Sequence, residues 1–153
     1  MQQSTTPTPS SSLTFTVIGK PAPQGSKRHV GRGVMVESSK RCKPWRQDVR
    51  HTALDLRPED WYANMDAAIS ISVVFVFARP KNHFRTNGQL KPSAPTYCTA
   101  RIGDVDKLAR SILDSLAGVL FAADEQVINL IAQKRYANDR EQPCAIITVS
   151  AVN

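Results

Sequence analysis

One stretch of alternating side chains constrains the fold of this chain more than any other feature. In Ala68–Phe77, every second position from Ile69 to Phe77 is apolar, as the pleat of a β-strand requires when one face is buried. The intervening positions combine serines with valines, so the opposite face is partly apolar as well. A strand with apolar side chains on both faces belongs in the interior of a sheet. We therefore expect a sheet built around this segment.

Alternating or apolar runs elsewhere predict further strands, and helical spacing predicts two helices. The other predicted strands are Leu13–Val17, Val34–Glu37, Val127–Tyr136 and Ala145–Val152. The last two are separated by a short turn, so we expect them to pair antiparallel. With 153 residues the chain is long enough for one domain with a hydrophobic core. The pattern predicts an α/β (α+β) fold, a single small domain whose mixed β-sheet carries two main helices on one face and leaves the other face to a partner.

A stripe of apolar side chains and two prolines predict the first helix. Pro44 is tolerated only in the first turn of a helix, so the helix should begin near Lys43, and Pro58 should follow its end. The stripe has helical spacing and should be buried. Its members are Cys42, Trp45, Val49, Ala53 and Leu56.

The second predicted helix follows Gly103 and carries two series of side chains. An apolar series recurs every four residues and should face the core, and a charged series out of phase with it should lie on the opposite side. The apolar series is Leu108, Ile112 and Leu116, and the charged series is Asp106, Arg110 and Asp114. Gly118 suits the left-handed conformation that closes a helix.

Polar segments mark a tail and two loops. Residues 1–12 consist mainly of Gln, Ser, Thr and Pro and predict a disordered tail ahead of a domain that spans residues 13–153. The glycine, proline and basic residues of Gly19–Gly33 predict a loop. Arg79–Ile102 predicts a long polar loop, a feature that is unusual inside a compact domain and is often functional.

The positive charge of the chain is concentrated in one part of it. The net charge is +7 and the pI about 9.7, which favours a polyanionic partner, nucleic acid rather than membrane. Nine of the 20 Lys and Arg residues fall between Lys20 and Arg50, against two acidic residues. We predict that this basic half contacts nucleic-acid phosphates, although a solvated charged surface would give the same pattern. The candidate DNA-binding residues are Lys20, Lys27, Arg28, Arg32, Lys40, Lys43, Arg46 and Arg50.

The cysteines and the lengths of the apolar runs indicate where in the cell the protein is expected. Cys42, Cys98 and Cys144 are odd in number, far apart and without zinc-site spacing, which is typical of reduced thiols in a cytosolic protein. No apolar run reaches the length needed to span a membrane, and the N-terminus lacks a signal-peptide pattern. We therefore expect a cytoplasmic protein that does not bind membranes.

The carboxylates around the second helix allow two interpretations. In the first, Asp104 caps the helix, and the charged series on its surface forms exposed ion pairs. In the second, Asp104, Asp106 and Asp124 converge on a divalent metal, because hard cations prefer carboxylate oxygens. An isolated D-x-D spacing does not decide between the two.

The whole block of motifs is more specific than its spacing. It consists of Asp104-x-Asp106-Lys107-Leu108, Asp114-x-Leu116 and Asp124-x-Gln126-Val127. Together these motifs resemble the RusA family of Holliday-junction resolvases, above all its phage-encoded members. The resemblance runs from about Leu13 onward and includes Gly25-Ser26-Lys27-Arg28 and Lys43-Pro44-Trp45-Arg46. Two positions differ: Ala123 replaces the first Asp of the family's Asp-Asp pair, and Arg110 replaces its catalytic lysine.

The resemblance implies an endodeoxyribonuclease that resolves Holliday junctions or other branched DNA by paired nicks. It implies Mg²⁺ as the cofactor, with Mn²⁺ as an alternative, and a homodimer that acts in the cytoplasm, the host's if the protein is phage-encoded. Asp104, Asp106 and Asp124 would be catalytic and hold the metal. Lys107 and Arg110 would complete the catalytic set by offsetting phosphate charge. Arginine is a fixed cation, so only the electrostatic part of the lysine's role is open to Arg110.

Two other functions are compatible with the sequence. A non-catalytic nucleic-acid-binding protein would use the basic half alone, bind without metal and leave DNA intact. A Mg²⁺-dependent nuclease acting on flaps or single strands would cut substrates that lack a four-way branch. Cleavage assays on different DNA structures distinguish these functions from junction resolution.

Overall fold

The computed structural model describes residues 11–25, 27–29, 31, 35–37, 40–99 and 102–152, and most of the predicted tail lies outside these ranges. The strands are β1 (Ser12–Ile18), β2 (Lys27–His29), β3 (Met35–Glu37), β4 (Ala68–Phe77), β5 (Val127–Tyr136) and β6 (Cys144–Val152). The helices are α1 (Cys42–Leu56) and α2 (Val105–Leu116), with short 3-10 turns η1 (Glu59–Asn64), η2 (Lys81–His83) and η3 (Asp124–Gln126). The mixed α+β fold and the central strand are as predicted.

The main sheet has four strands in the order β1-β6-β4-β5. β4 lies between β6, with which it pairs antiparallel, and β5, with which it pairs parallel. The central place of β4 follows from its composition, because apolar side chains on both faces need cover on both sides. One face of β4 joins the main core, and on the other face Val76 joins a small second cluster with Ala137 and Cys144.

The predicted pairing of the last two strands is wrong. β5 and β6 run in opposite directions, but β4 lies between them, so neither hydrogen-bonds to the other. The connection between them covers residues 137–143. It has to span two strand spacings, about 10 Å, which seven residues reach easily. Proximity in the sequence therefore predicted the wrong neighbour, because the apolar strand β4 lies between the two.

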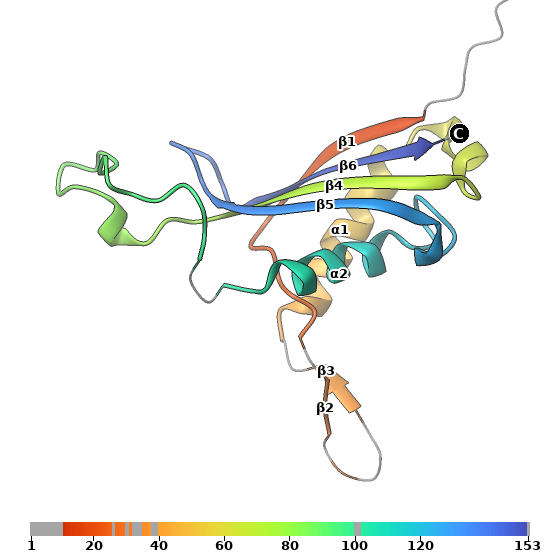
Figure 1. Ribbon diagram of the computed structural model, residues 1–153, viewed down its shortest axis with the longest axis horizontal. Helices are drawn as coiled ribbons and strands as arrows, with labels where there is room; N and C mark the ends of the chain where they lie inside the picture. The colour runs from red at the N-terminus through yellow and green to blue at the C-terminus, as the bar shows by residue number, and fades with distance from the viewer. Residues whose placement is uncertain are drawn as a thin grey trace, which may run out of the picture.

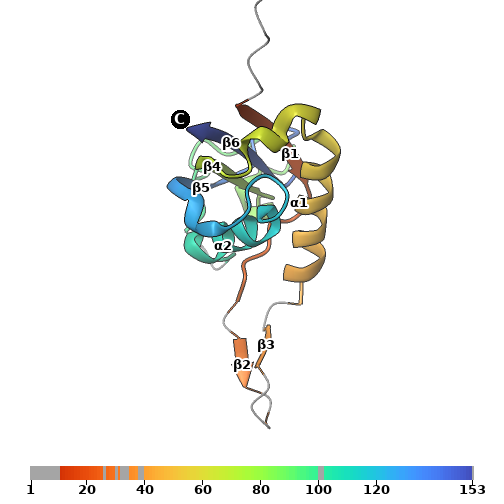
Figure 2. The same cartoon turned by 90° about the vertical axis from the view of Figure 1, so that its right-hand side faces the viewer.

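Both helices cover one face of the sheet, as predicted (Figures 1 and 2). α1 begins at Cys42, one residue earlier than expected, and buries Trp45, Val49 and Ala53. The predicted burial of Leu56 is wrong, since this last helical residue is 52% exposed. The adjoining core is filled instead by Trp61 of η1, which is fully buried and donates a hydrogen bond from Nε1 to the carbonyl of Leu120 at 2.9 Å.

The predicted loop over Gly19–Gly33 contains a strand that the sequence pattern missed. β2 pairs antiparallel with β3, with Lys27 opposite Glu37, and the hairpin extends away from the main sheet (Figure 1). Strands of three residues are too short to show an alternation. The hairpin carries part of the basic half away from the folded body.

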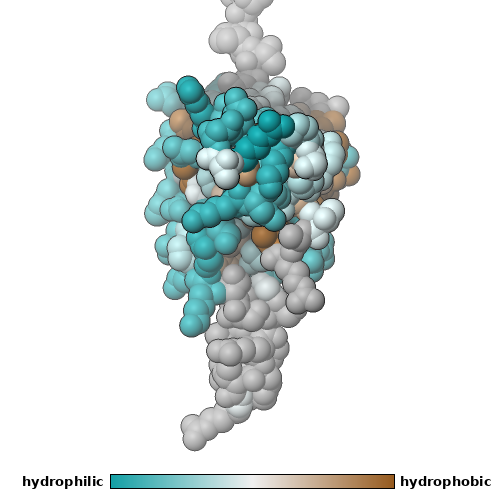
Figure 3. All heavy atoms as spheres, turned by 90° about the vertical axis from the view of Figure 1, so that its left-hand side faces the viewer, coloured by the Kyte–Doolittle hydropathy of each residue, from teal (hydrophilic) through white to brown (hydrophobic). Residues whose placement is uncertain are grey.

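The long loop between β4 and α2 is fixed to the sheet through Arg79. Its guanidinium donates hydrogen bonds from Nε to the carbonyl of Ala137 at 2.8 Å and from Nη1 to the carbonyl of Pro95 at 2.7 Å. It also lies over the ring of Tyr136, 5.4 Å from the centroid. The surface at this end of the molecule is largely hydrophilic (Figure 3). No helix among the described residues is long and apolar enough to cross a membrane.

Candidate active site

α2 has the two-sided character that the sequence predicted. Leu108, Ile112 and Leu116 are fully buried in the main core. Asp106 and Arg110 are exposed on the other side, and Asp114 is half-buried. Gly118 follows the helix with φ of +82°, the left-handed conformation expected of a closing glycine. The buried face therefore orients the charged series outward.

The N-terminus of α2 is held in place by the chain around it. Gly103 has φ of +122°, and a side chain there would meet Leu108 Cδ2 and Pro23 Cγ at 3.3 Å, so glycine is required. Its carbonyl accepts a hydrogen bond from Lys134 Nζ of β5 at 2.9 Å. The backbone N–H of Gln24 donates to the carbonyl of Lys107 at 3.0 Å. These contacts fix the helix start between the sheet and residues 19–25.

Asp104 does little for the stability of this helix start. Asp104 occupies the N-cap position, but its side chain makes no capping hydrogen bond. Its carboxylate pairs with Lys107 Nζ at 3.6 Å, an exposed contact of small energetic value. Among the described residues, no ion pair links Asp106, Arg110 and Asp114. The interpretation of this series as a cap followed by ion pairs is therefore not supported.

Asp124 lies on a separate turn that Gln126 holds. The Gln126 side chain accepts a hydrogen bond from the N–H of Ala123 at 2.8 Å and donates to the carbonyls of Met65 and Ala67 at 2.6 and 2.9 Å. This side chain ties η3 to the segment that enters β4. Asp124 itself is exposed at the first position of the turn.

Within one chain, the three predicted metal ligands belong to segments at opposite ends of α2, its start and the turn before β5 (Figure 1). Asp104 and Asp106 are at its start, and Asp124 lies in the turn that leads into β5 beyond its other end. The 12 residues of α2 span about 18 Å. In agreement with this separation, no three His, Cys, Asp or Glu residues come together as a potential metal site within the described ranges. The role of all three carboxylates as ligands stays a prediction.

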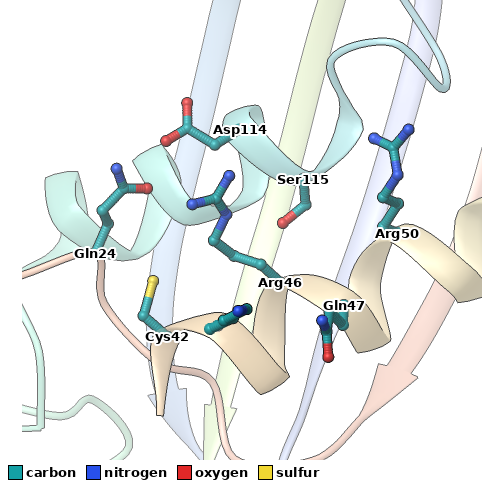
Figure 4. Close-up of a pocket in the computed structure, with 8 residues that line it drawn as sticks. Gln24, Cys42, Arg46, Gln47, Arg50, Asp114 and Ser115 are labelled. Carbon is teal, nitrogen blue, oxygen red and sulfur yellow. The ribbon is translucent and has the colours of Figure 1, made fainter. Parts of the chain in front are cut away.

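The predicted DNA-binding residues whose side chains are described fall into two groups beside α1. Lys43, Arg46 and Arg50 line a pocket of about 440 Å³ between α1 and α2, whose opposite wall includes Asp114 (Figure 4). Lys20 and Lys40 line a second pocket, of about 370 Å³, on a different face of α1. The side chains of Lys27 and Arg28, and all of Arg32, lie outside the described part of the chain. A basic surface therefore borders the helix that carries the candidate carboxylates.

The family model for endodeoxyribonuclease RusA matches residues 18–149. The chain belongs to the RusA family. Membership makes it an endodeoxyribonuclease, a hydrolase that acts on DNA, and excludes the non-catalytic binding protein that the basic half alone would have allowed. A comparison with curated proteins gave no match.

The structure of this RusA-family chain also identifies residues that sequence reasoning missed. Gln126 stands within a recognised motif, but its three hydrogen bonds show that it positions the turn of Asp124. Lys134 lies in register with buried Phe75 of β4, which predicts that it points toward the helices. The sequence did carry a signal for the contact between Lys134 and Gly103: a lysine interrupts the otherwise apolar, inward-facing positions of β5.

Proposed function

We propose that this protein is a divalent-metal-dependent nuclease that resolves Holliday junctions by paired nicks. The observation that carries the proposal is the pair of exposed carboxylates, Asp104 and Asp106, on a firmly anchored helix start where neither makes a capping bond. Exposed carboxylates that begin a helix without capping it, beside a basic surface, support a catalytic role. Membership of an endodeoxyribonuclease family supports the same conclusion.

The helix start fits a magnesium ion. Mg²⁺ is usually bound by one or two carboxylates together with waters and substrate phosphates, and Asp104 and Asp106 are of this kind; Mn²⁺ has similar ligand preferences. When bound, the cation supplies a nucleophilic water and neutralises charge on the phosphate. Lys107 and Arg110, on the first turns of the same helix, would offset the remaining phosphate charge. Arg110 serves as a fixed cation only.

The position of Asp124 supports a homodimer in which two chains build each site. A two-fold axis that crosses the middle of α2 would place the start of one helix beside the end of the other. Asp124 of one chain would then lie near Asp104 and Asp106 of its partner. This arrangement gives two sites per dimer, which matches the two nicks that a four-way junction needs.

An exposed apolar strand supports this interface. β5 is an edge strand of the main sheet, and its first half begins directly after the turn that carries Asp124. Ile128, Leu130 and Ile131 in this half are 63%, 41% and 58% exposed. Exposed apolar side chains on an open sheet edge favour association with a partner. A second copy covering this edge would approach the turn of Asp124.

Cleavage of defined DNA structures tests the proposal. The wild-type protein should cut labelled four-way junctions in Mg²⁺ at symmetric positions, and should cut forks, flaps and duplexes much more slowly. Asp106→Asn should lose cleavage by orders of magnitude and bind junctions as well as the wild type or better, because a negative charge beside the phosphates is removed. The matched control is Asp139→Asn, at an exposed carboxylate in the turn before β6. Faster cleavage of flaps than of junctions would establish the flap nuclease instead.

A further inference from the structure

The pocket between α1 and α2 has a lining that the cleavage chemistry does not use. Lys43, Arg46 and Arg50 of α1 face Asp114 and Ser115 of α2 across it. Gln24, from the segment that fixes the helix start, closes one end (Figure 4). The volume of the pocket, about 440 Å³, lies within the range of small-ligand sites.

Two side chains of this pocket carry buried polar atoms of opposite character. Gln24 Oε1, an acceptor, and Arg46 Nε, a donor, have no hydrogen-bond partner within the described structure. Leaving such atoms unsatisfied is costly, so each such atom calls for an explanation. Both side chains line the pocket and are only half-buried. Figure 4 shows Arg46 reaching from α1 toward the gap between Gln24 and Asp114.

The mixture of donors and acceptors in the lining indicates the chemistry of the ligand. A phosphate offers only acceptors, so it would accept from Arg46 and from Gln24 Nε2 but would be repelled by the carboxylate of Asp114. A nucleobase presents donors and acceptors side by side on one edge and can satisfy both side chains. Lys43 and Arg50 supply positive charge on the pocket wall for the phosphates that flank such a base.

The pocket lies at a suitable distance from the proposed cleavage site. Asp114 is eight residues beyond Asp106 on α2, or about 12 Å along the helix. That distance corresponds to about three to four nucleotides at the spacing of a stacked strand. We propose that this pocket binds an unstacked nucleobase of the DNA substrate and thereby sets a nucleotide preference near the cut. The inference rests on the proposed function, because it assumes that DNA is cut at the start of α2.

Fluorescent base analogues in junction DNA test the proposal. 2-Aminopurine, or pyrrolocytosine at cytosine positions, is placed in turn at each of the six nucleotides on either side of the cut, and binding is followed without metal to prevent cleavage. The wild type should raise the fluorescence several-fold at one position, because an unstacked base loses its quenching neighbours. Gln24→Ala and Arg46→Met should abolish this rise. The control variant Gln142→Ala changes an exposed glutamine in the turn before β6 and should retain the fluorescence rise.

Cleavage rates measured in parallel in Mg²⁺ separate this proposal from the nuclease function. Gln24→Ala should cut junctions but lose roughly tenfold in discrimination among the four bases at the identified position, the loss expected for one base contact. A wild type that cuts junctions without any fluorescence rise overturns the pocket alone. A rise that survives in both pocket variants, with melting temperatures unchanged, also overturns it. A wild type that cuts no DNA contradicts the nuclease function, and the pocket proposal with it.

Discussion

Replacing Gln126 by alanine tests how the turn that carries Asp124 is held. The variant loses three hydrogen bonds, one from the N–H of Ala123 and two to the carbonyls of Met65 and Ala67. At about 1 kcal/mol per bond, the free energy of unfolding should fall by about 3 kcal/mol. Met65 keeps a second donor, the N–H of Ala122 at 3.1 Å, so the loss should not greatly exceed this sum. For a chain of this size, the melting temperature should drop by about 6–12 °C.

Urea unfolding followed by circular dichroism measures this change, with Gln142→Ala as the matched control that should stay within about 0.5 kcal/mol of the wild type. The variant should also cut DNA more slowly, because Asp124 is no longer fixed. Gln126→Glu retains the acceptor but loses both donations and places a negative charge beside two carbonyls, so it should be less stable than the alanine variant. A loss below about 0.5 kcal/mol in Gln126→Ala would refute the assignment of this side chain as the anchor of η3.

Three further predictions concern the core, pH and salt. Ile112→Ala should lower the free energy of unfolding by about 2–5 kcal/mol, and an unchanged melting temperature would mean that α2 is phased wrongly. The hydrogen bonds from Arg135 at 2.6 and 2.9 Å lower the pKa of the Glu141 carboxyl below its ordinary 4.5. The ion pair between the two residues therefore stabilises the fold fully above pH 4.5. This stabilisation is lost as the pH falls through the lowered pKa of Glu141. Urea unfolding at a series of pH values should show this loss in the wild type and not in Glu141→Gln. Replacing Lys27, Arg28 and Arg32 by glutamine should reduce the slope of log DNA-binding affinity against log salt concentration by about 0.9 per lost phosphate contact. As a control, replacing Lys81 and Lys91 of the long loop by glutamine should leave this slope unchanged.

Local patterns predicted most of the elements and most of their buried positions, but not β2 or the exposure of Leu56. β4 and β5 have the predicted bounds, and the apolar series of α2 is fully buried, because each depends on the periodicity of nearby residues. Strand order depends on contacts between distant segments. The separation of β5 from β6 by β4 was therefore missed, although every strand of the main sheet was found.

The candidate site likewise has features that local patterns predicted and features that depend on distant segments. The outward orientation of Asp106 and Arg110 followed from the phase of the helix. The separation of Asp104 from Asp124 could not be predicted in this way. A motif states which residues occur, and not whether one chain or two chains bring them together. The same holds for Gln24 and Lys134, which reach the start of α2 from distant parts of the sequence.

Mixing two inactive variants tests most directly whether two chains build each site. Asp106→Asn and Asp124→Asn are unfolded together, refolded as a mixture and assayed on a plasmid that extrudes a cruciform. If each site combines α2 of one chain with Asp124 of the other, a mixed dimer has one intact site and one doubly altered site. Random pairing then restores about a quarter of the wild-type sites, and the product is nicked rather than linear plasmid. If each chain supplies all three carboxylates to its own site, every site in the mixture is altered. A mixture as inactive as either variant alone, with the mixed dimer shown to form, would contradict the account.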